Sequence, residues 1–405
     1  MSFDPRAVRA QFPVFEHRPE GFHYLDSAAT GQICRAAAEA MLTFETQNRA
    51  NVKRGIYPLA EAATEAFADA RRSIAEYLGA TDPDEVILTS GTTLGINLFA
   101  HAFGQRLAAG DEIVLSELEH HSNIVPWQLL RARTGAAIRV LPVTDDGRLD
   151  LDRLGEIVTE RCRVIAVTHA SNVTGALTDL GPIVAAARAV GARVLVDGAQ
   201  RAPHGPLDVP ALGVDAYAIS GHKMFGPTGG GALWVRGELL EELPPFLGGG
   251  EMINRVTFAN TEYAPAPHRF EAGTPPIGAA IGMAAAARFL AALDWQAATR
   301  HELALTGRLL DGLAQLPGVR VIGPAGLQGR IGVVSFDAEG AHAHDICHLL
   351  GARGVCLRGG HHCAQPLMDR FGVVATARAS LAPYNDAADI DALLEGLDEA
   401  LAILR

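Results

Sequence analysis

The stretch DAYAISGHKMFGPTGGG, residues 215–231, decides the fold of this chain. Its apolar run Ala216–Ile219 predicts a buried strand that leads directly into Ser220-Gly221-His222-Lys223. A turn rich in glycine and proline follows, and the apolar run Ala232–Val235 predicts a second strand. Because the two runs lie close together in the sequence, we expect an antiparallel pair of strands.

Lys223 lies between these two strands, which are predicted to be buried. An unpaired ammonium group is costly to bury, so lysines are retained in such places mainly where the amine does chemistry, most often as a Schiff base. A surface lysine in a hairpin loop explains the stretch equally well on its own, because loop lysines are common. The rest of the chain has to decide between the two interpretations.

Upstream of Lys223, short apolar runs alternate with helical patterns. The predicted strands are 85–89, 112–115, 138–142, 164–168 and 193–196, and the predicted helices are 4–12, 35–48, 59–78, 94–108, 124–134, 150–160 and 180–190. Such apolar runs are typical of strands that are buried on both faces. The βαβ succession predicts an α/β fold with a mostly parallel sheet between helices.

Beyond residue 240 the pattern changes. Segments rich in glycine and proline are followed by predicted helices at 277–292, 295–315, 344–352 and 386–404, with short strands at 319–322, 331–336, 355–358 and 375–380. This mixture predicts a second, smaller α+β domain. We therefore divide the chain into an N-terminal segment that packs with the small domain (1–25), a large α/β domain (26–276) and a small C-terminal domain (277–405).

Composition excludes some classes of function. The 405 residues carry a net charge of −12, which argues against a nucleic-acid-binding surface. No apolar run reaches membrane-spanning length, and the N-terminal sequence MSFDPRAVRAQFPVF lacks the pattern of a signal peptide. The five cysteines are odd in number and scattered, as is typical of reduced thiols. We expect a cytoplasmic protein.

Two segments place polar groups at predicted strand ends. Ser90–Thr93 begins a helix, where backbone N–H groups and hydroxyls can bind a phosphate, although Thr92 or Thr93 could equally cap the helix. Asp197 ends the strand 193–196, at the edge of the sheet where ligands bind in open α/β folds. Its carboxylate could hold the proton of a ring nitrogen, or cap the next turn.

His120 and His121 follow another strand end, where a histidine could stack on an aromatic ligand or shuttle protons. The pair is also half of a metal site. No cysteine or carboxylate accompanies it at metal-ligand spacing, so we expect no metal.

Together these segments predict one ligand. The ends of successive strands supply a phosphate cradle, an acidic group, a stacking histidine and a lysine. Pyridoxal 5′-phosphate (PLP) carries a phosphate, a pyridine nitrogen and an aldehyde, and it needs this set of partners.

Over nearly its whole length the chain resembles the class V, fold type I aminotransferase superfamily, and within it the type II cysteine desulfurases of the SufS and CsdA kind. The motifs are LDSAAT at 25–30, GTTLGIN at 91–97, EHHSNIVPW at 119–127, THASNVTG at 168–175, VDGAQ at 196–200, SGHKMFGPTG at 220–229, RFEAGTP at 269–275, RGGHHCAQPL at 358–367 and RASLAPYN at 378–385. The resemblance implies the PLP-dependent fold type I, with a seven-stranded-type sheet, and a homodimer with shared sites.

The resemblance also implies roles for individual residues. The cofactor contacts are Lys223 (Schiff base), Asp197 (pyridinium nitrogen), Gln200 (phenolic oxygen), His120 (ring stacking), Thr93, Ser220 and His222 (phosphate) and Thr274 (phosphate of the neighbouring subunit). The substrate-binding residues are Asn172, Arg358 and Arg378, and the arginine fork suits a carboxylate. The catalytic residues are Lys223, His120 and Cys363.

Cys363 lies in a polar, His-rich loop, 358–363, whose basic neighbours favour the thiolate. The resemblance implies that it takes sulfur from L-cysteine as a persulfide, releases L-alanine, and passes the sulfur to a SufE-type or SufU-type acceptor for Fe–S cluster assembly or related sulfur trafficking. The alternatives are a selenocysteine lyase, acting on L-selenocysteine, and a docking component with low free turnover. Cys347 and Cys356 lie in apolar segments and are interpreted as core residues, whereas Cys34 and Cys162 carry no motif.

Some positions depart from close relatives. Lys53 and Tyr57 stand where some relatives carry histidine, and Gly359 stands where some carry threonine, which could loosen the Cys363 loop. The segment His342-Ala343-His344-Asp345 resembles one that engages the zinc of a U-type acceptor. A solvated helix N-terminus with incidental histidines explains that segment equally well.

Overall fold

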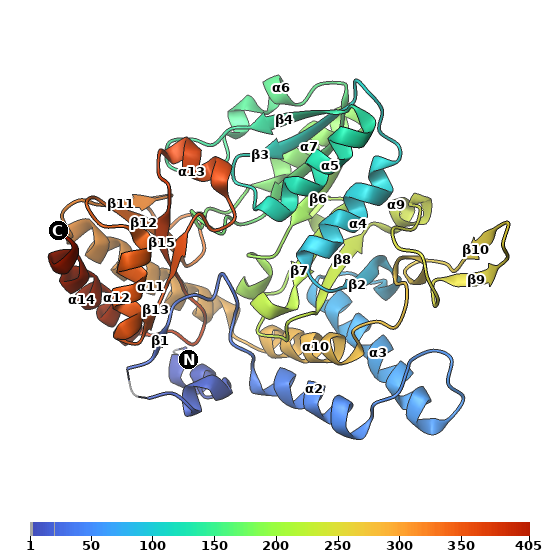
Figure 1. Cartoon of the computed structure of the whole chain (residues 1–405), viewed down its shortest axis with the longest axis horizontal. Coiled ribbons are helices and arrows are strands. Elements are labelled where there is room, and N and C mark those ends of the chain that lie inside the picture. Colours follow the sequence, from blue (N-terminus) through green and yellow to red (C-terminus); the bar gives the residue numbers. More distant parts are fainter. Residues whose placement is uncertain (1–2, 20) are drawn as a thin grey trace.

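The computed structural model describes residues 3–19 and 21–405. Its centre is a seven-stranded sheet with the strand order β2-β8-β7-β6-β5-β3-β4 (Figure 1). The strands are β2 (Val86–Thr89), β3 (Glu112–Ser116), β4 (Ala137–Leu141), β5 (Cys162–Thr168), β6 (Arg193–Asp197), β7 (Ala216–Ser220) and β8 (Gly231–Val235). All of the strands predicted for the large sheet are present, and the α/β fold is confirmed.

The sheet is mostly parallel. β8 is antiparallel to both of its neighbours, β2 and β7, whereas the pairs formed among β3 to β7 are parallel. The antiparallel pair predicted around Lys223 is therefore confirmed. Because Ser220 at the end of β7 lies opposite Gly231 at the start of β8, the segment that carries Lys223 leaves and re-enters the sheet at the same edge.

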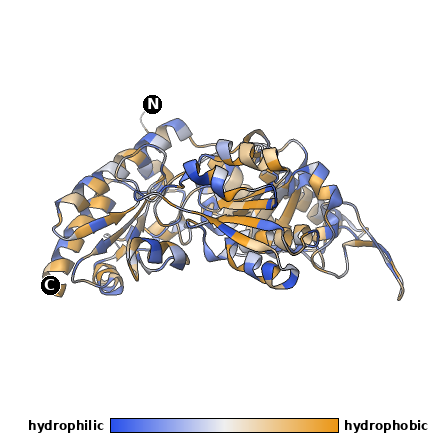
Figure 2. Cartoon of the chain, turned by 90° about the horizontal axis from the view of Figure 1, so that it is seen from above, coloured by the Kyte–Doolittle hydropathy of each residue, from blue (hydrophilic) through white to orange (hydrophobic). Residues whose placement is uncertain are grey.

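Helices cover both faces of this sheet. Alternate strand residues face opposite layers: Ile165 and Val167 of β5 pack on one side, and Val164 and Ala166 pack on the other. The first layer holds α2 (Arg35–Gln47), α3 (Pro58–Tyr77), α7 (Leu180–Val190) and α10 (Ile277–Ala291), and the second holds α4 (Thr92–Gly104), α5 (Val125–Thr134) and α9 (Gly237–Glu242). Burial on both faces explains the continuous apolar runs in the sequence, which Figure 2 shows as orange strands.

A second, smaller sheet lies toward the C-terminus, as predicted. Its strands are antiparallel and follow the order β11-β12-β15-β14. Its elements are β11 (Val319–Ile322), β12 (Val333–Ala338), β14 (Arg358–Gly360), β15 (Thr376–Ser380), α11 (Trp295–Gln315), α12 (Ala343–Ala352), α13 (Gln365–Phe371) and α14 (Ala387–Leu404). Leu309, Phe336 and Leu397 share a core that joins the helices to this sheet.

The division of the chain into domains remains a prediction. At the N-terminus, α1 (Pro5–Arg9) precedes β1 (His23–Tyr24), which pairs with β13 (Val355–Cys356) of the C-terminal part. His23 also binds Asp389 of α14 at 2.7 Å. α10 begins at the proposed boundary, but it packs against α2 and α3 in the core of the large sheet.

The structure corrects several predicted elements. The helix expected over 4–12 ends at Arg9, and a separate turn begins at Pro13, because proline lacks the N–H that would continue a helix. The helix expected at 150–160 is the single turn α6 (Leu154–Ile157), and α8 (Val209–Leu212) is another single turn. The strand expected at 355–358 is divided between β13 and β14, which join different sheets.

A hairpin lies where no strand was expected. It consists of β9 (Ile253–Val256) and β10 (Thr261–Tyr263), and it extends away from the body of the molecule (Figure 1). Phe258 near its tip is fully exposed, and Val256 is more than half exposed. Because the hairpin buries no face, its sequence carries no periodic apolar pattern.

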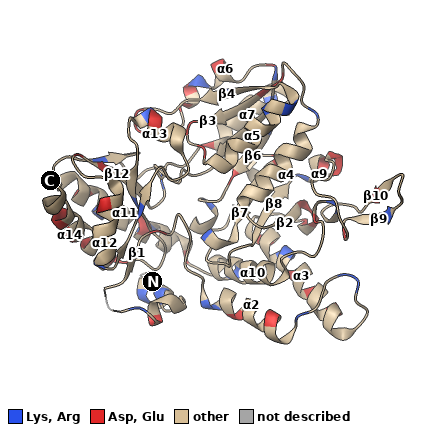
Figure 3. Cartoon of the chain, viewed as in Figure 1, with Lys and Arg blue, Asp and Glu red and all other residues tan. Residues whose placement is uncertain are grey.

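The positions of the charged residues and the hydropathy of the helices agree with the expectations drawn from composition. Acidic and basic residues are interspersed along the outer helices and loops in the view of Figure 3. Among the described residues, no single helix is long and apolar enough to cross a membrane. α10 and α11 pass such a test only as a pair that is bent by 87°.

Candidate active site

The predicted site residues meet at the carboxyl ends of β5, β6 and β7, in a pocket of about 170 Å³. The large sheet and the segment that follows β14 both contribute to its walls. Its lining includes eleven predicted residues: Thr93, His120, Asn172, Asp197, Gln200, Ser220, His222, Lys223, Arg358, Cys363 and Arg378. Thr274 does not join them, because it lines a separate hollow with Met41 and Pro275.

Lys223 follows β7 in the short turn Gly221–Lys223 and lines this pocket. Burial lowers the pKa of its amine to about 8, although the charge of Asp197 opposes the shift. An amine with this pKa is partly neutral near pH 7 and can act as a nucleophile. The alternative of a surface lysine in a hairpin loop is therefore wrong.

Asp197 ends β6 and is almost completely buried. Burial raises the pKa of its carboxyl group, although Lys223 opposes that shift. One carboxylate oxygen accepts a hydrogen bond from the backbone N–H of Ala199 at 3.0 Å, so the residue also caps the following turn. A cationic ring nitrogen beside this carboxylate would favour its charged form.

The N-terminus of α4 has hydroxyls that do not cap the helix. Its N-cap is Gly91, whose φ of 146° suits glycine. The Thr92 N–H donates to Ser220 Oγ at 2.8 Å, and the two hydroxyl oxygens are also 2.8 Å apart. Thr93 is exposed to the pocket. The helix N-terminus and these hydroxyls suit an anion. The sequence left open whether Thr92 takes part in binding a phosphate or caps the helix, and in the structure it does not cap the helix.

His120 is held in a tight turn after β3. Its Nδ1 accepts a hydrogen bond from the Ser122 N–H at 3.1 Å and lies 2.6 Å from Ser122 Oγ. Burial, assisted by the charge of Lys223, lowers its pKa to about 3, so the ring is neutral. The neighbouring Glu119 anchors this turn, because its carboxylate accepts from Asn123 Nδ2 at 2.7 Å and from the Thr168 N–H at 3.0 Å.

The segment around Thr30 supports the opposite wall. Gln200 Nε2 donates to the carbonyl of Ala28 at 2.8 Å. His222 Nδ1 lies 3.2 Å from Thr30 Oγ1, and burial lowers the pKa of His222 to about 4. Both side chains line the pocket in fixed orientations.

The Cys363 loop comes from the small sheet but is held by the large one. The carbonyl of Cys363 accepts from the His121 N–H at 2.7 Å, and the carbonyl of His362 accepts from Asn172 Nδ2 at 2.7 Å. His362 and Cys363 have φ values of 51° and 56°, a left-handed conformation that costs on the order of 1 kcal/mol for each such residue. Arg358 Nη2 lies 3.9 Å from the Cys363 sulfur.

Arg378 links the two sheets. Its guanidinium donates to the carbonyl of Asn172 and to the carboxylate of Asp26, both at 3.0 Å. Its Nε is buried, and no protein partner accepts from it among the residues that the structure describes. A carboxylate in the pocket is a suitable acceptor for this donor.

Comparisons with known proteins agree with this arrangement. Residues 23–393 match the Aminotransferase class-V family. A probable cysteine desulfurase of Streptomyces coelicolor is 45% identical over 403 residues, which cover 98% of this chain and 96% of the relative. The solved cysteine desulfurase CsdA of Escherichia coli, in an S-sulfonic acid form, is 41% identical, with a TM-score of 0.93 and complete coverage of both chains.

The chain belongs to the class V aminotransferase family, among its cysteine desulfurases. The predicted fold type I and enzyme class are confirmed. A more distant structure, a C-DES variant with glycine covalently linked to its PLP cofactor, is 26% identical, with a TM-score of 0.82 and coverage of 96% of this chain and 99% of that one. PLP is thus a cofactor found in this family, and the anion cradle, Asp197 and Lys223 of this desulfurase form a donor set that fits it.

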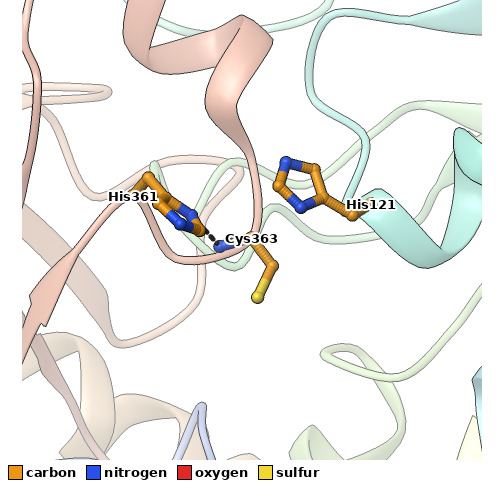
Figure 4. Close-up of side chains that lie close together, drawn as sticks. All are labelled: His121, His361 and Cys363. Carbon is orange, nitrogen blue, oxygen red and sulfur yellow. Dashed lines mark hydrogen bonds between the residues drawn. The ribbon is translucent and has the colours of Figure 1, made fainter.

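The structure corrects the argument against a metal. Cys363 and His361 lie beside His121, although 242 positions separate His121 from Cys363 in the sequence (363 − 121). The ligand atoms of the three side chains all lie within 4.8 Å of one another (Figure 4). Sequence spacing could not reveal this cluster, because His121 follows β3 and the other two residues follow β14.

The other thiols of this desulfurase lie elsewhere. Cys34 and Cys162 are fully buried, whereas Cys347 and Cys356 are only partly buried. The interpretation of Cys347 and Cys356 as core residues holds only in part, because Cys347 packs against the small core without full burial and Cys356 is likewise only partly buried. Cys347 follows the exposed N-terminal turn of α12, so only one side of it packs against the small core.

The structure shows the surroundings of Lys53, Tyr57 and Gly359, the positions that we expected to depart from relatives. Lys53 Nζ lies 3.0 Å from His268 Nδ1, and Tyr57 is half exposed, so neither lines the pocket. A Cβ atom at Gly359 would lie 3.0 Å from the Ala343 carbonyl oxygen and 2.9 Å from His344 Cδ2. Glycine therefore lets α12 pack closely against the strand that precedes the Cys363 loop, and a threonine there would require a shift.

His362 gives a testable pH dependence. Burial, assisted by Arg378 and Arg358, lowers its pKa to about 2, against about 6.5 in the unfolded chain. The unfolded chain therefore binds a proton that the folded chain does not, and the free energy of unfolding falls as the pH drops below about 6.5. His362→Gln is expected to reduce this slope by about 1 kcal/mol per pH unit.

Urea denaturation of the holoenzyme, followed by tryptophan fluorescence from about pH 7 to about pH 5, measures the slope. His348→Gln removes an exposed imidazole and serves as the control. Equal slopes for wild type and His362→Gln would show that His362 is not held neutral.

Proposed function

We propose that this desulfurase binds PLP at Lys223, takes L-cysteine as its substrate, and receives the substrate sulfur on Cys363. The single observation that carries the proposal is the pocket itself. It brings a lysine of lowered pKa, a buried carboxylate and a partly exposed thiol from two different sheets into one space of about 170 Å³.

The cofactor roles are those that the resemblance to cysteine desulfurases implies, and each residue that receives one here lines the pocket. Lys223 would hold the aldehyde carbon, Asp197 the ring nitrogen and Gln200 the phenolic oxygen, while the neutral ring of His120 would stack on the pyridine. Thr93, Ser220 and His222 would receive the phosphate at the N-terminus of α4. When bound, PLP supplies an electron sink that makes the Cα proton of the substrate acidic.

Three residues favour an amino-acid substrate. Arg378 offers its Nε, which has no partner among the described residues, and Arg358 and Asn172 line the same pocket. Together they would fix a carboxylate, so that the substrate sulfur points toward Cys363. The amine of Lys223, with a pKa of about 8, is suited to move the Cα proton near neutral pH.

Cys363 then acts as the nucleophile. Its thiolate attacks the substrate sulfur, an S–S bond forms, and the substrate Cβ–S bond breaks with its electron pair left on carbon. A proton taken up at that carbon completes L-alanine, and the enzyme holds a persulfide. The side chain of Arg358 is the nearest donor, with its Nη2 3.9 Å from this sulfur.

Cys363→Ala tests the assignment. The variant is expected to retain the absorbance of bound PLP, because Cys363 makes no predicted cofactor contact, and to lose cysteine-dependent alanine and sulfide formation by roughly a hundredfold or more. Cys347→Ala, which lies outside the pocket, is the matched control. Normal turnover of L-cysteine by Cys363→Ala would sink the proposal.

Substrate preference of the wild-type enzyme separates the first alternative, because a selenocysteine lyase would turn over L-selenocysteine in preference to L-cysteine. Activity of Cys363→Ala on L-selenocysteine does not separate the two, because the selenol is ionised near neutral pH and selenium release can proceed without the thiol. A docking component would turn over slowly until an acceptor is added. The partly neutral Lys223 and the partly exposed Cys363 favour an active desulfurase.

A homodimer in the cytoplasm is part of the proposal. α2, α3 and α10 frame an open hollow of about 820 Å³ with a largely apolar lining, which suits a second copy of the chain. Thr274 and Pro275 line a hollow that is separate from the active-site pocket of the same chain. This position is the one expected of a residue that contacts the PLP phosphate bound by a partner subunit. All five cysteines are free, which supports a reducing compartment.

For the acceptor, the exposed pair His342 and His344 supports a zinc-binding U-type protein. His342 caps α12, and the two rings lie 5.0 Å apart at its N-terminus. We expect His342→Ala to lose at least about tenfold in affinity for a zinc-loaded U-type acceptor, measured by calorimetry. Tight binding of a metal-free E-type acceptor, unchanged by His342→Ala, would exclude this assignment.

A further inference from the structure

We propose that His121, His361 and Cys363 form a binding site for a thiophilic divalent cation such as Zn²⁺, and that the cation reversibly blocks the Cys363 sulfur. The three side chains come from two elements, the turn after β3 and the loop after β14. Figure 4 shows the rings of His121 and His361 on either side of Cys363. The inhibitory consequence rests on the proposed function of Cys363, whereas the metal site does not.

The geometry is close to that of a zinc site. Zinc–nitrogen and zinc–sulfur bonds of about 2.0 to 2.3 Å place tetrahedral ligand atoms roughly 3.3 to 3.7 Å apart. The ligand atoms of this cluster already lie within 4.8 Å of one another, so a contraction of about 1 Å completes the site. Gly360, with a φ of 138°, ends β14 immediately before His361, in a conformation that favours glycine.

The donor set selects the metal. One thiolate and two imidazoles are typical ligands of zinc, whereas magnesium and calcium prefer oxygen. Three protein ligands leave a fourth position that opens toward the pocket and solvent, because His361 is exposed and the other two residues are partly exposed.

Competing hydrogen bonds make metal binding at this site reversible. His361 Nδ1 accepts from the Cys363 N–H at 3.0 Å, and His121 Nε2 accepts from the Gln365 N–H at 3.1 Å. A neutral imidazole has one lone pair, so each ring must give up its backbone donor or change tautomer to bind a metal. Binding is therefore weaker than in a structural zinc site, and a chelator is expected to reverse it.

Occupation of the site changes the chemistry of Cys363. The thiol proton is released to solvent, a sulfur–zinc bond forms, and no electron is transferred because Zn²⁺ has no redox chemistry. The bound sulfur can then neither attack a substrate nor be alkylated. Zn²⁺ would thus hold the desulfurase in a resting state until a stronger ligand removes the metal.

Cobalt titration of chelator-treated holoenzyme tests the site, because Co²⁺ in a tetrahedral sulfur and nitrogen site absorbs in the visible range. We expect saturable d–d bands together with a sulfur-to-cobalt charge-transfer band, and displacement of both by Zn²⁺. Cys363→Ser is expected to abolish the charge-transfer band. His121→Gln and His361→Gln should each weaken Co²⁺ binding by roughly tenfold or more. His348→Gln, an exposed histidine of α12, is the control.

A second measurement separates the site from the proposed function. Zn²⁺ should protect Cys363 from iodoacetamide, measured on its peptide by mass spectrometry, and should stop alanine formation until a chelator is added. Protection without inhibition would leave the site intact and contradict the function of Cys363. The absence of saturable bands would overturn the site. Bands that are unchanged in both histidine variants, with PLP still bound, would also overturn it, because the thiol would then be the only ligand of the three.

Discussion

The buried guanidinium of Arg378 is the contact on which the active site depends. It is 1% exposed. It donates to the carbonyl of Asn172, in the loop that follows β5, and to the carboxylate of Asp26, in the N-terminal segment that follows β1. Both partners lie outside the small sheet, so loss of these contacts would weaken the docking of that sheet by about 1 to 3 kcal/mol, because Asp26 remains partly exposed. Asn172 in turn holds the carbonyl of His362. The position of Cys363 relative to Lys223 follows from this chain of contacts.

Burial also changes the protonation of the titratable groups in the pocket. The pocket lowers the pKa of His120 to about 3, of His222 to about 4 and of Lys223 to about 8. The two histidines are therefore neutral and Lys223 is partly neutral at the place where a proton has to move, while Arg358 and Arg378 line the same pocket. An anionic carboxylate and a thiolate are the groups that such a distribution favours.

The sequence predicted more of the fold and the site than of their surroundings, for physical reasons. Strands buried on both faces leave apolar runs, and parallel strands end at one edge, so Asp197 and Lys223 could be placed together in advance. The exposed hairpin β9–β10 buries no face and left no pattern. The cluster of His121, His361 and Cys363 depends on the docking of two sheets, which no local spacing records. The packing of α12 against Gly359 likewise depends on tertiary contact.

The central claim is that sulfur passes from L-cysteine to Cys363 and to no other thiol of the chain. Incubation of the holoenzyme with L-cysteine in the absence of acceptor and reductant, followed by peptide mass spectrometry, tests it most directly. The account predicts a gain of one sulfur atom on the peptide that contains Cys363, with none on the peptides of Cys34, Cys162, Cys347 and Cys356. Persulfide on another cysteine, or alanine formed without any persulfide on Cys363, would contradict it.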